Sequence, residues 1–281
     1  MSPPVHLDGM TVPIHVVDAF TDTPFRGNPA AVVVLDRPAD DRWMQQVAAE
    51  MRHSETAFVS MPERDSDGTR TLRWFTPTAE VDLCGHATLA TGHILGGSQR
   101  FATRSGILVT TAGPDGWITM DFPLDRVTTL EGADAGLVSA LGGVPVVAVT
   151  RGASDLLVEV NSADDVATII PDIDAVSALK ARGVIITARA DVPGIDFVSR
   201  CFYPAVGIPE DPVTGSAHCT LAAWWSAQLG RSALVASQLS SRGGTVKMRV
   251  SGDRVLLSGQ AVTVLTGELV AAPAHYAASR R

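Results

Sequence analysis

The chain has 281 residues, of which 46% are hydrophobic and 19% are charged, so it is long and apolar enough for one large or two ordinary cores. Its net charge of −8 excludes the clustered positive surface that nucleic acids require. No apolar run approaches the roughly 20 residues that span a bilayer. The N-terminal segment lacks the basic and apolar regions of a secretory leader, so we expect a cytoplasmic protein.

The predicted elements mix strands with helices. Two β-rich runs are followed by a capped amphipathic helix, and later strands lead twice into an apolar helix and a hairpin. In chain order we expect strands at 14–20 and 30–35, a helix from Asp40 or Asp41 to Met51, strands at 56–61 and 71–75, a helix at 87–95, a strand at 117–122, a helix at 217–229 and a strand at 254–257. This mixture predicts an α/β chain of the α+β type.

Two stretches of the chain resemble one another. The pattern R-x-F-x-P begins at Arg73 and again at Arg200, about 130 residues later, and each copy leads through an acid-bearing loop into G-x-A, an apolar helix and a polar hairpin signal. Such matches in one order indicate a duplication, so we expect two pseudo-symmetric domains with a small-molecule site between them. We place the domains at residues 1–127 and 128–270, with a flexible tail at 271–281.

The two G-x-A turns are candidates for ligand binding. Gly85 and Gly215 each lead into the first turn of an apolar helix. A helix N-terminus presents unpaired N–H groups and the positive end of the helix dipole, and glycine lets a ligand approach the backbone. If the halves face one another, both helix ends can clamp one carboxylate. Each copy alone is equally consistent with a helix that binds nothing, and the duplication favours a site.

Three titratable side chains accompany these turns. Glu55 follows the first predicted helix, His86 lies within the first G-x-A turn, and Asp211 precedes the second. Two carboxylates and a histidine around an anion clamp suit the removal of a proton from carbon and its return. The helix ends would stabilise the charge that builds up on the substrate's carboxylate. Taken singly, these residues also have structural interpretations as a surface acid, a buried histidine and a helix cap.

Cys84 precedes the first turn, but Thr214 occupies the corresponding place in the second half, so a symmetric two-thiol racemase fails on sequence. The remaining hypothesis for Cys84 is an accessory thiolate whose pKa is lowered by the helix N-terminus. The three cysteines form no CxxC pair, and no further ligands complete a metal site around His86 and His93. Without a suitable lysine for a Schiff base or a glycine-rich phosphate loop, we expect no metal and no cofactor.

The chain resembles the phenazine-biosynthesis PhzF-like isomerases, which share the diaminopimelate-epimerase-like fold. The similar segments run nearly end to end and include D-A-F, G-N-P-A, S-E-T-A-F, R-W-F-T-P, G-H-A-T and E-D-P-V-T-G-S-A. They lie at residues 18–20, 27–30, 54–58, 73–77, 85–88 and 210–217, together with Gln238 and Arg242-Gly243. The combination of these segments makes the resemblance specific.

This resemblance implies a fold in which each half wraps a curved sheet around a central helix, with a cofactor-free site between the halves. It also implies a protein that is often a homodimer. Glu55 then corresponds to the general acid/base, which moves a proton between carbons of an unsaturated amino acid, and His86 and Asp211 are its partners.

The same resemblance makes Gly85, Gly215 and Ser216 the carboxylate and substrate contacts. Cys84, which we also place among the substrate-binding residues, departs from the phenazine enzyme itself. That enzyme has a small apolar residue there, whereas a cysteine is similar to the epimerase relatives. The departure leaves the role of Cys84 open.

Three hypotheses for function follow. The main one is an isomerase that shifts a proton, and hence a double bond, in a small carboxylic or amino acid. The second is an epimerase or racemase that uses Glu55 or Asp211 with Cys84 as bases on opposite faces. The third is a protein that binds a carboxylate without turning it over.

Overall fold

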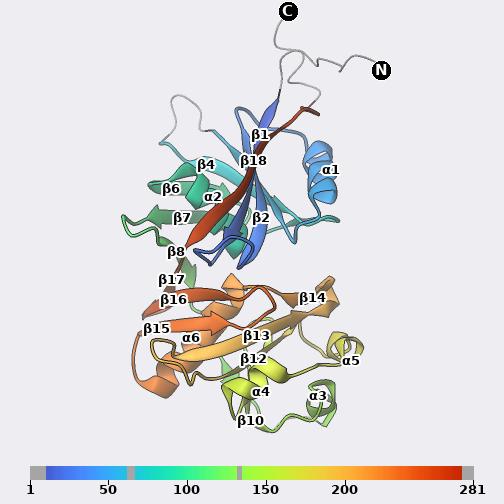
Figure 1. Ribbon diagram of the computed structural model, residues 1–281, viewed down its shortest axis with the longest axis vertical. Helices are drawn as coiled ribbons and strands as arrows, with labels where there is room; N and C mark the ends of the chain where they lie inside the picture. Colours follow the sequence, from blue (N-terminus) through green and yellow to red (C-terminus); the bar gives the residue numbers. More distant parts are fainter. Residues whose placement is uncertain (1–10, 62–66, 132–134, 274–281) are drawn as a thin grey trace, which may run out of the picture.

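The computed structural model describes residues 11–61, 67–131 and 135–273, which form two bodies that are each a curved sheet around one long helix (Figure 1). The expected tail at 271–281 therefore lies mostly outside the described residues. In the part of the chain that is described, no helix combines the length and apolarity needed to cross a bilayer.

Strands dominate both bodies. The first contains β1 (Val12–Ala19), β2 (Asn28–Leu35), α1 (Asp41–Met51), β3 (Thr56–Ser60), β4 (Arg70–Phe75), β5 (Glu80–Val81), α2 (Gly85–Leu95), β6 (Ser98–Thr103), β7 (Gly106–Ala112) and β8 (Ile118–Pro123). Next come β9 (Thr128–Thr129), α3 (Ala135–Ala140), β10 (Val146–Arg151), β11 (Leu156–Val160), α4 (Ala163–Thr168), α5 (Ile173–Ser177), β12 (Val184–Arg189), β13 (Phe197–Tyr203), a 3₁₀ turn (Pro204–Val206), β14 (Ile208–Asp211), α6 (Gly215–Leu229), β15 (Ala233–Gln238), β16 (Gly244–Ser251), β17 (Arg254–Gly259) and β18 (Ala261–Leu269).

The strand pairings of the first body recur in the second. In the first, β2 and β3 are parallel, β3 and β4 antiparallel, β4 and β6 parallel, and β6 and β7 antiparallel. In the second, β11, β12, β13, β15 and β16 pair in the same sequence of orientations. The expected pair of pseudo-symmetric domains is therefore confirmed as the architecture.

The central helices explain why the apolar runs after the G-x-A turns are so uniform. A helix that is apolar on all sides must be buried. Accordingly, α2 packs against β1, β2, β3, β6, β7, β8 and β18, and α6 packs against β15, β16 and β17. The ranges expected at 87–95 and 217–229 are confirmed as helices, and each begins two residues earlier, at its glycine.

The repeated R-x-F motif marks equivalent ion pairs. Arg73 donates from Nε and Nη2 to the Glu80 carboxylate, at 2.7 Å each, and Arg200 donates to Glu210 at 2.7 and 3.0 Å. Each guanidinium also lies over the phenylalanine two residues later, about 5 Å from the ring centroid. The duplication seen in the sequence is thus a duplicated side-chain arrangement.

Two strand pairings tie the bodies together. β8 pairs antiparallel with β17, and β18, the last strand in sequence, returns to pair antiparallel with β1 (Figure 1). The equivalent of β18 in the second body is β9, which pairs with β10. The chain therefore crosses between the bodies twice, and the division at residue 127 stays a prediction.

Candidate functional site

The N-termini of the two central helices meet at their glycines. A Cβ atom built on Gly85 would lie 3.3 Å from the Cα of Gly215, and one on Gly215 would lie 3.3 Å from the Cα of Gly85. Because the atom each would meet belongs to backbone, a larger residue at either position requires the helix ends to move apart. These contacts bring the two halves of the duplication to one place.

Neither of these helices is capped by its own N-cap side chain. Cys84 and Thr214, the N-cap residues of α2 and α6, make no capping hydrogen bond, whereas Asp40 caps α1 by accepting from the backbone N–H of Trp43 at 2.9 Å. The side chains of Cys84 and Thr214 therefore do not accept hydrogen bonds from the first-turn N–H groups of α2 and α6. The positive ends of the two helix dipoles lie close together. Such an arrangement suits a bound anion.

Glu55, Cys84 and His86 form one cluster at this junction. His86 Nε2 lies 3.4 Å from Glu55 Oε2 and 3.3 Å from Ser54 Oγ, while His86 Nδ1 lies 3.5 Å from Cys84 Sγ. Glu55 lies between the end of α1 and the start of β3, and the other two residues open α2. The imidazole thus stands between the carboxylate and the thiol.

Burial decides the charges in this cluster. It raises the pKa of the Glu55 carboxyl, against hydrogen bonds from Ser54 and Cys84 that lower it. It lowers the pKa of His86 to about 4, so the ring is neutral near pH 7. The contact between His86 and Glu55 therefore involves a neutral imidazole and is not an ion pair. A carboxyl with a raised pKa is better matched to proton transfer near neutrality.

The expectation of a lowered pKa for Cys84 is wrong. Cys84 is buried at the first turn of α2, and burial raises the pKa of its thiol well above 9.0, followed by repulsion from the Glu55 charge. The helix dipole is too weak to overcome the loss of water around a thiolate. Cys84 is therefore a neutral thiol at pH 7.

Asp211 is held in place by three side chains. Asn28 donates from Nδ2 to Asp211 Oδ1 at 2.8 Å, and Thr214 donates from Oγ1 to Asp211 Oδ2 at 2.5 Å. Gln238 donates to the Asp211 backbone carbonyl at 2.7 Å and accepts from the Thr214 N–H at 2.9 Å. Burial raises the pKa of Asp211, and the nearby Glu55 charge raises it further.

No hydrogen bond among the described residues joins Asp211 directly to Glu55 or His86; they interact through space. The sequence placed Asn28 and Gln238 in family-like segments without giving them a role. Both are fully buried and orient Asp211. Ser216, the second residue of α6, accepts a hydrogen bond from Arg182, a residue for which the sequence gave no signal.

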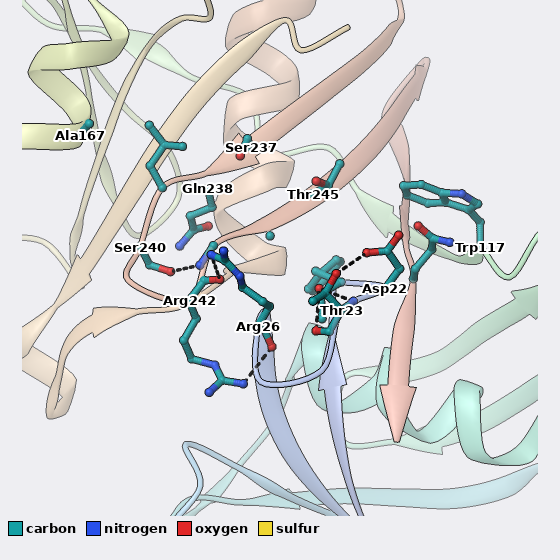
Figure 2. Close-up of a pocket in the computed structure, with 16 residues that line it drawn as sticks. Asp22, Thr23, Arg26, Trp117, Ala167, Ser237, Gln238, Ser240, Arg242 and Thr245 are labelled. Atoms are coloured by element: carbon teal, nitrogen blue, oxygen red, sulfur yellow. Dashed lines mark hydrogen bonds between the residues drawn. The ribbon is translucent and has the colours of Figure 1, made fainter. Parts of the chain in front are cut away.

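A cavity of about 600 Å³ opens beside this junction (Figure 2). Its walls come from the β1–β2 loop, the β15–β16 turn and the start of β8, and include Arg26, Trp117 and Arg242. Gln238 forms part of its wall and also contacts Asp211, so the cavity borders the site, although Glu55 and His86 do not line it.

Comparison with known proteins identifies the family. Residues 17–267 match the family model described as phenazine biosynthesis-like protein, PhzC-PhzF. The chain belongs to this family. It is 47% identical over 269 residues to an uncharacterized isomerase of Halalkalibacterium halodurans, covering 93% of this chain and 99% of that protein.

Two further comparisons agree. A second uncharacterized isomerase, from Pseudomonas aeruginosa, is 45% identical over 92% of this chain and 99% of its own length. The crystal structure of a PhzF-family phenazine biosynthesis protein from Enterococcus faecalis superposes with a TM-score of 0.87 at 38% identity, covering 92% of this chain and 99% of that chain. An isomerase- or epimerase-like activity is supported by these relatives.

In this PhzF-family chain, Glu55, Cys84 and His86 each offer a donor atom within 4.8 Å of the others. From the sequence, all three are candidate site residues, but only His86 and His93 are considered there as metal ligands. The two ring nitrogens of His86 face different partners, Cys84 and Glu55, and one ion would use only one of them. The expectation of no metal stays a prediction.

The neutral histidines of this family member give a testable pH dependence. Burial lowers the pKa of His86 and of His218 to about 4, from an ordinary value of 6.5. Between about pH 6.5 and about 4 the unfolded chain binds these protons more tightly, so the stability due to the neutral rings is lost as the pH falls through that window. Glu55 and Asp211, whose pKa values are raised, act with the opposite sign.

Because these contributions oppose one another, each group needs its own titration. We expect ¹⁵N NMR of the ring nitrogens to give midpoints near 4 for His86 and His218. A midpoint at or above 6.5 for His86 would show instead that it forms an ion pair with Glu55.

Proposed function

We propose that this protein is a cofactor-independent isomerase that moves a proton, and with it a double bond, in a small carboxylic or amino acid. The observation that carries the proposal is the position of Glu55, a carboxyl only 13% exposed that contacts His86 at the junction of two uncapped helix N-termini. A homodimer in the cytoplasm completes the proposal, on the basis of the family resemblance.

The proposed reaction uses the helix ends as an anion clamp. The substrate's carboxylate lies against the first turns of α2 and α6, where Gly85, Gly215 and Ser216 supply backbone N–H groups. The Glu55 carboxylate removes a proton from a substrate carbon, and the electron pair left behind delocalises toward the clamped carboxylate. The two positive helix ends stabilise that developing charge. Glu55, now a carboxylic acid, returns the proton to a different carbon, which shifts the double bond.

His86 and Asp211 support this step in different ways. A neutral His86 contacts Glu55 without neutralising it, so the carboxyl keeps its raised pKa. Asp211, fixed by Asn28 and Thr214, offers a carboxyl from the second half to a polar group of the substrate. The site thus receives one carboxyl from each half of the duplication.

An epimerase is the second candidate, because the Cys84 thiol lies 3.5 Å from His86 Nδ1 and its sulfur is within 4.8 Å of a Glu55 carboxylate oxygen. In that reaction Glu55 removes the α-proton on one face, and the Cys84 thiol delivers a proton to the other. The high pKa of Cys84 keeps the thiol protonated, which suits delivery of a proton but opposes the reverse direction.

The experiment is deuterium exchange in D₂O, followed by NMR, across a panel of small unsaturated and amino carboxylates. Deuterium at a new position with a shifted double bond supports the isomerase. Deuterium at the α-carbon with inversion supports the epimerase. A compound that binds, as shown by thermal stabilisation, but exchanges no proton would overturn both and leave a carboxylate-binding protein.

A further inference from the structure

The Arg182 side chain is fixed at the second half of the junction. Its Nε and Nη2 donate to the two carboxylate oxygens of Asp155, at 2.8 and 2.5 Å, and its guanidinium lies 5.0 Å from the centroid of the Tyr203 ring. The Asp155 side chain is only 3% exposed. A Cβ on the next residue, Gly183, would lie 2.1 Å from the Tyr203 ring, so glycine is required there. The guanidinium is therefore preorganised.

The Nη1 amino group of this guanidinium remains available. Asp155 occupies the edge formed by Nε and Nη2, while Nη2 also donates to Ser216 Oγ at 3.1 Å. Nη1 makes no hydrogen bond to any described residue, and the side chain is 39% exposed. Nη2 has given both of its hydrogens, so Nη1 is the free amino group of a guanidinium that Ser216 anchors at the first turn of α6. A fixed, charged N–H donor of this kind suits a carboxylate oxygen.

The duplication places Arg182 opposite Glu55. Thr56 starts β3 and pairs with Ala31 of β2, as Val184 starts β12 and pairs with Leu156 of β11. Arg182 is therefore the equivalent of Ser54, two residues before each strand.

The partners of these two residues are also equivalent. Ser54 contacts His86, the second residue of α2, and Arg182 contacts Ser216, the second residue of α6. The segment before β3 thus supplies Glu55, and the equivalent segment before β12 supplies the cation of Arg182. Both lie at the junction of the first turns of α2 and α6.

The charges of the site call for such a cation. Glu55 and Asp211 are acids, Cys84 is a neutral thiol, and His86 carries no charge near pH 7. Those groups alone would repel an anionic substrate. Asp155 and Ser216 contact different sides of the Arg182 guanidinium. The ion pair is therefore a dipole, and its positive end lies next to Ser216.

We propose that Arg182 is a specificity-determining residue of this site, whose Nη1 group binds the substrate's carboxylate together with the first turn of α6. The site then selects anionic carboxylates over their uncharged amides. This inference rests on the proposed function, because it takes the ligand to lie where the two helix ends meet.

The test measures binding rather than turnover. Benzoate and sorbate, each against its amide, are titrated into isotopically labelled full-length protein, and the backbone N–H signals of Gly85, Gly215 and Ser216 are followed by NMR. Because Arg182→Met alone would leave the buried Asp155 carboxylate unpaired, the comparison is between Asp155→Asn and the double variant Asp155→Asn/Arg182→Met. These two variants differ only in the cation.

A matched control removes another arginine paired with an aspartate. Arg231 pairs with Asp196 just beyond the C-terminal end of α6, and Arg231→Met should leave carboxylate binding unchanged. We expect the double variant to bind the carboxylates about 10- to 100-fold more weakly than Asp155→Asn, the range of one charged hydrogen bond. Binding of the amides should be weaker than that of the carboxylates in the wild type and unaffected by the loss of Arg182.

Equal carboxylate affinity in the two variants would overturn the proposal for Arg182, as would equal binding of carboxylates and amides by the wild type, or the absence of any shift at the three N–H groups. Failure of the proposed function is a separate result, namely binding of carboxylates without deuterium exchange. Binding that depends on Arg182 would stand in that case.

Discussion

The Glu55→Gln variant is expected to lose deuterium exchange at carbon by about 10²- to 10⁴-fold, the usual contribution of a general acid/base. Glutamine has the same shape but cannot accept or return a proton at neutral pH. Its amide can still hydrogen-bond His86 Nε2, which lies 3.4 Å from the carboxylate in the wild type. The fold and the carboxylate clamp should therefore survive, so ligand-induced thermal stabilisation is expected to remain while exchange is lost.

Glu159→Gln is the matched control for this variant. Glu159 is a partly buried carboxyl on β11 whose pKa is also raised by burial, and it accepts a hydrogen bond from Trp224 Nε1 at 3.0 Å. It takes no part in the cluster around His86, so its replacement should leave exchange at the wild-type rate. If Glu55→Gln retained most of the exchange while binding normally, the proton-transferring group would have to be Asp211 or Cys84.

The features predicted from the sequence are those encoded locally. Arg73 and Arg200 belong to short motifs that share the pattern R-x-F-x-P, and each forms an equivalent ion pair and ring contact in its own half. The central helices were visible as uniformly apolar runs after a glycine, because burial on all sides leaves no polar face in the sequence.

The features that were missed depend on contacts between distant segments. The partner of β18 is β1, and nothing within an alternating strand specifies which edge it will join. The ionisation of Cys84 follows burial by the complete fold, which its position beside Gly85 does not reveal. Arg182 has no charged counterpart in the first half, where Ser54 occupies the equivalent position, so comparing the two copies could not identify it.

The second prediction with a large expected effect concerns Arg242 and the stability of the folded chain. Arg242, in the β15–β16 turn, donates to Asp18 Oδ1 and to the backbone carbonyl of Gly27, at 2.7 Å each. It also donates to the backbone carbonyl of Arg26 at 2.9 Å (Figure 2). Asp18 is only 2% exposed and also accepts from the Phe25 N–H at 2.6 Å. This network joins a turn of the second body to the β1–β2 loop of the first.

Replacing Arg242 by Met is expected to lower the free energy of unfolding by about 3 kcal/mol, the lower end for breaking a buried pair, because Arg242 itself is partly exposed. The loss arises mainly from leaving the Asp18 carboxylate buried without its cation. Urea unfolding measures it. Arg254→Met, which removes an exposed pair with Asp121, should cost less than about 1 kcal/mol.

The double variant Asp18→Asn/Arg242→Met separates the charge from the contacts. Asparagine keeps an oxygen that can accept from the Phe25 N–H, so removing the buried charge should recover much of the stability lost in Arg242→Met. If the double variant is as unstable as Arg242→Met, the loss comes instead from the hydrogen bonds to Gly27 and Arg26. In that case the hydrogen bonds from Arg242 to these two backbone carbonyls join the bodies, and the Asp18 charge contributes little to the stability.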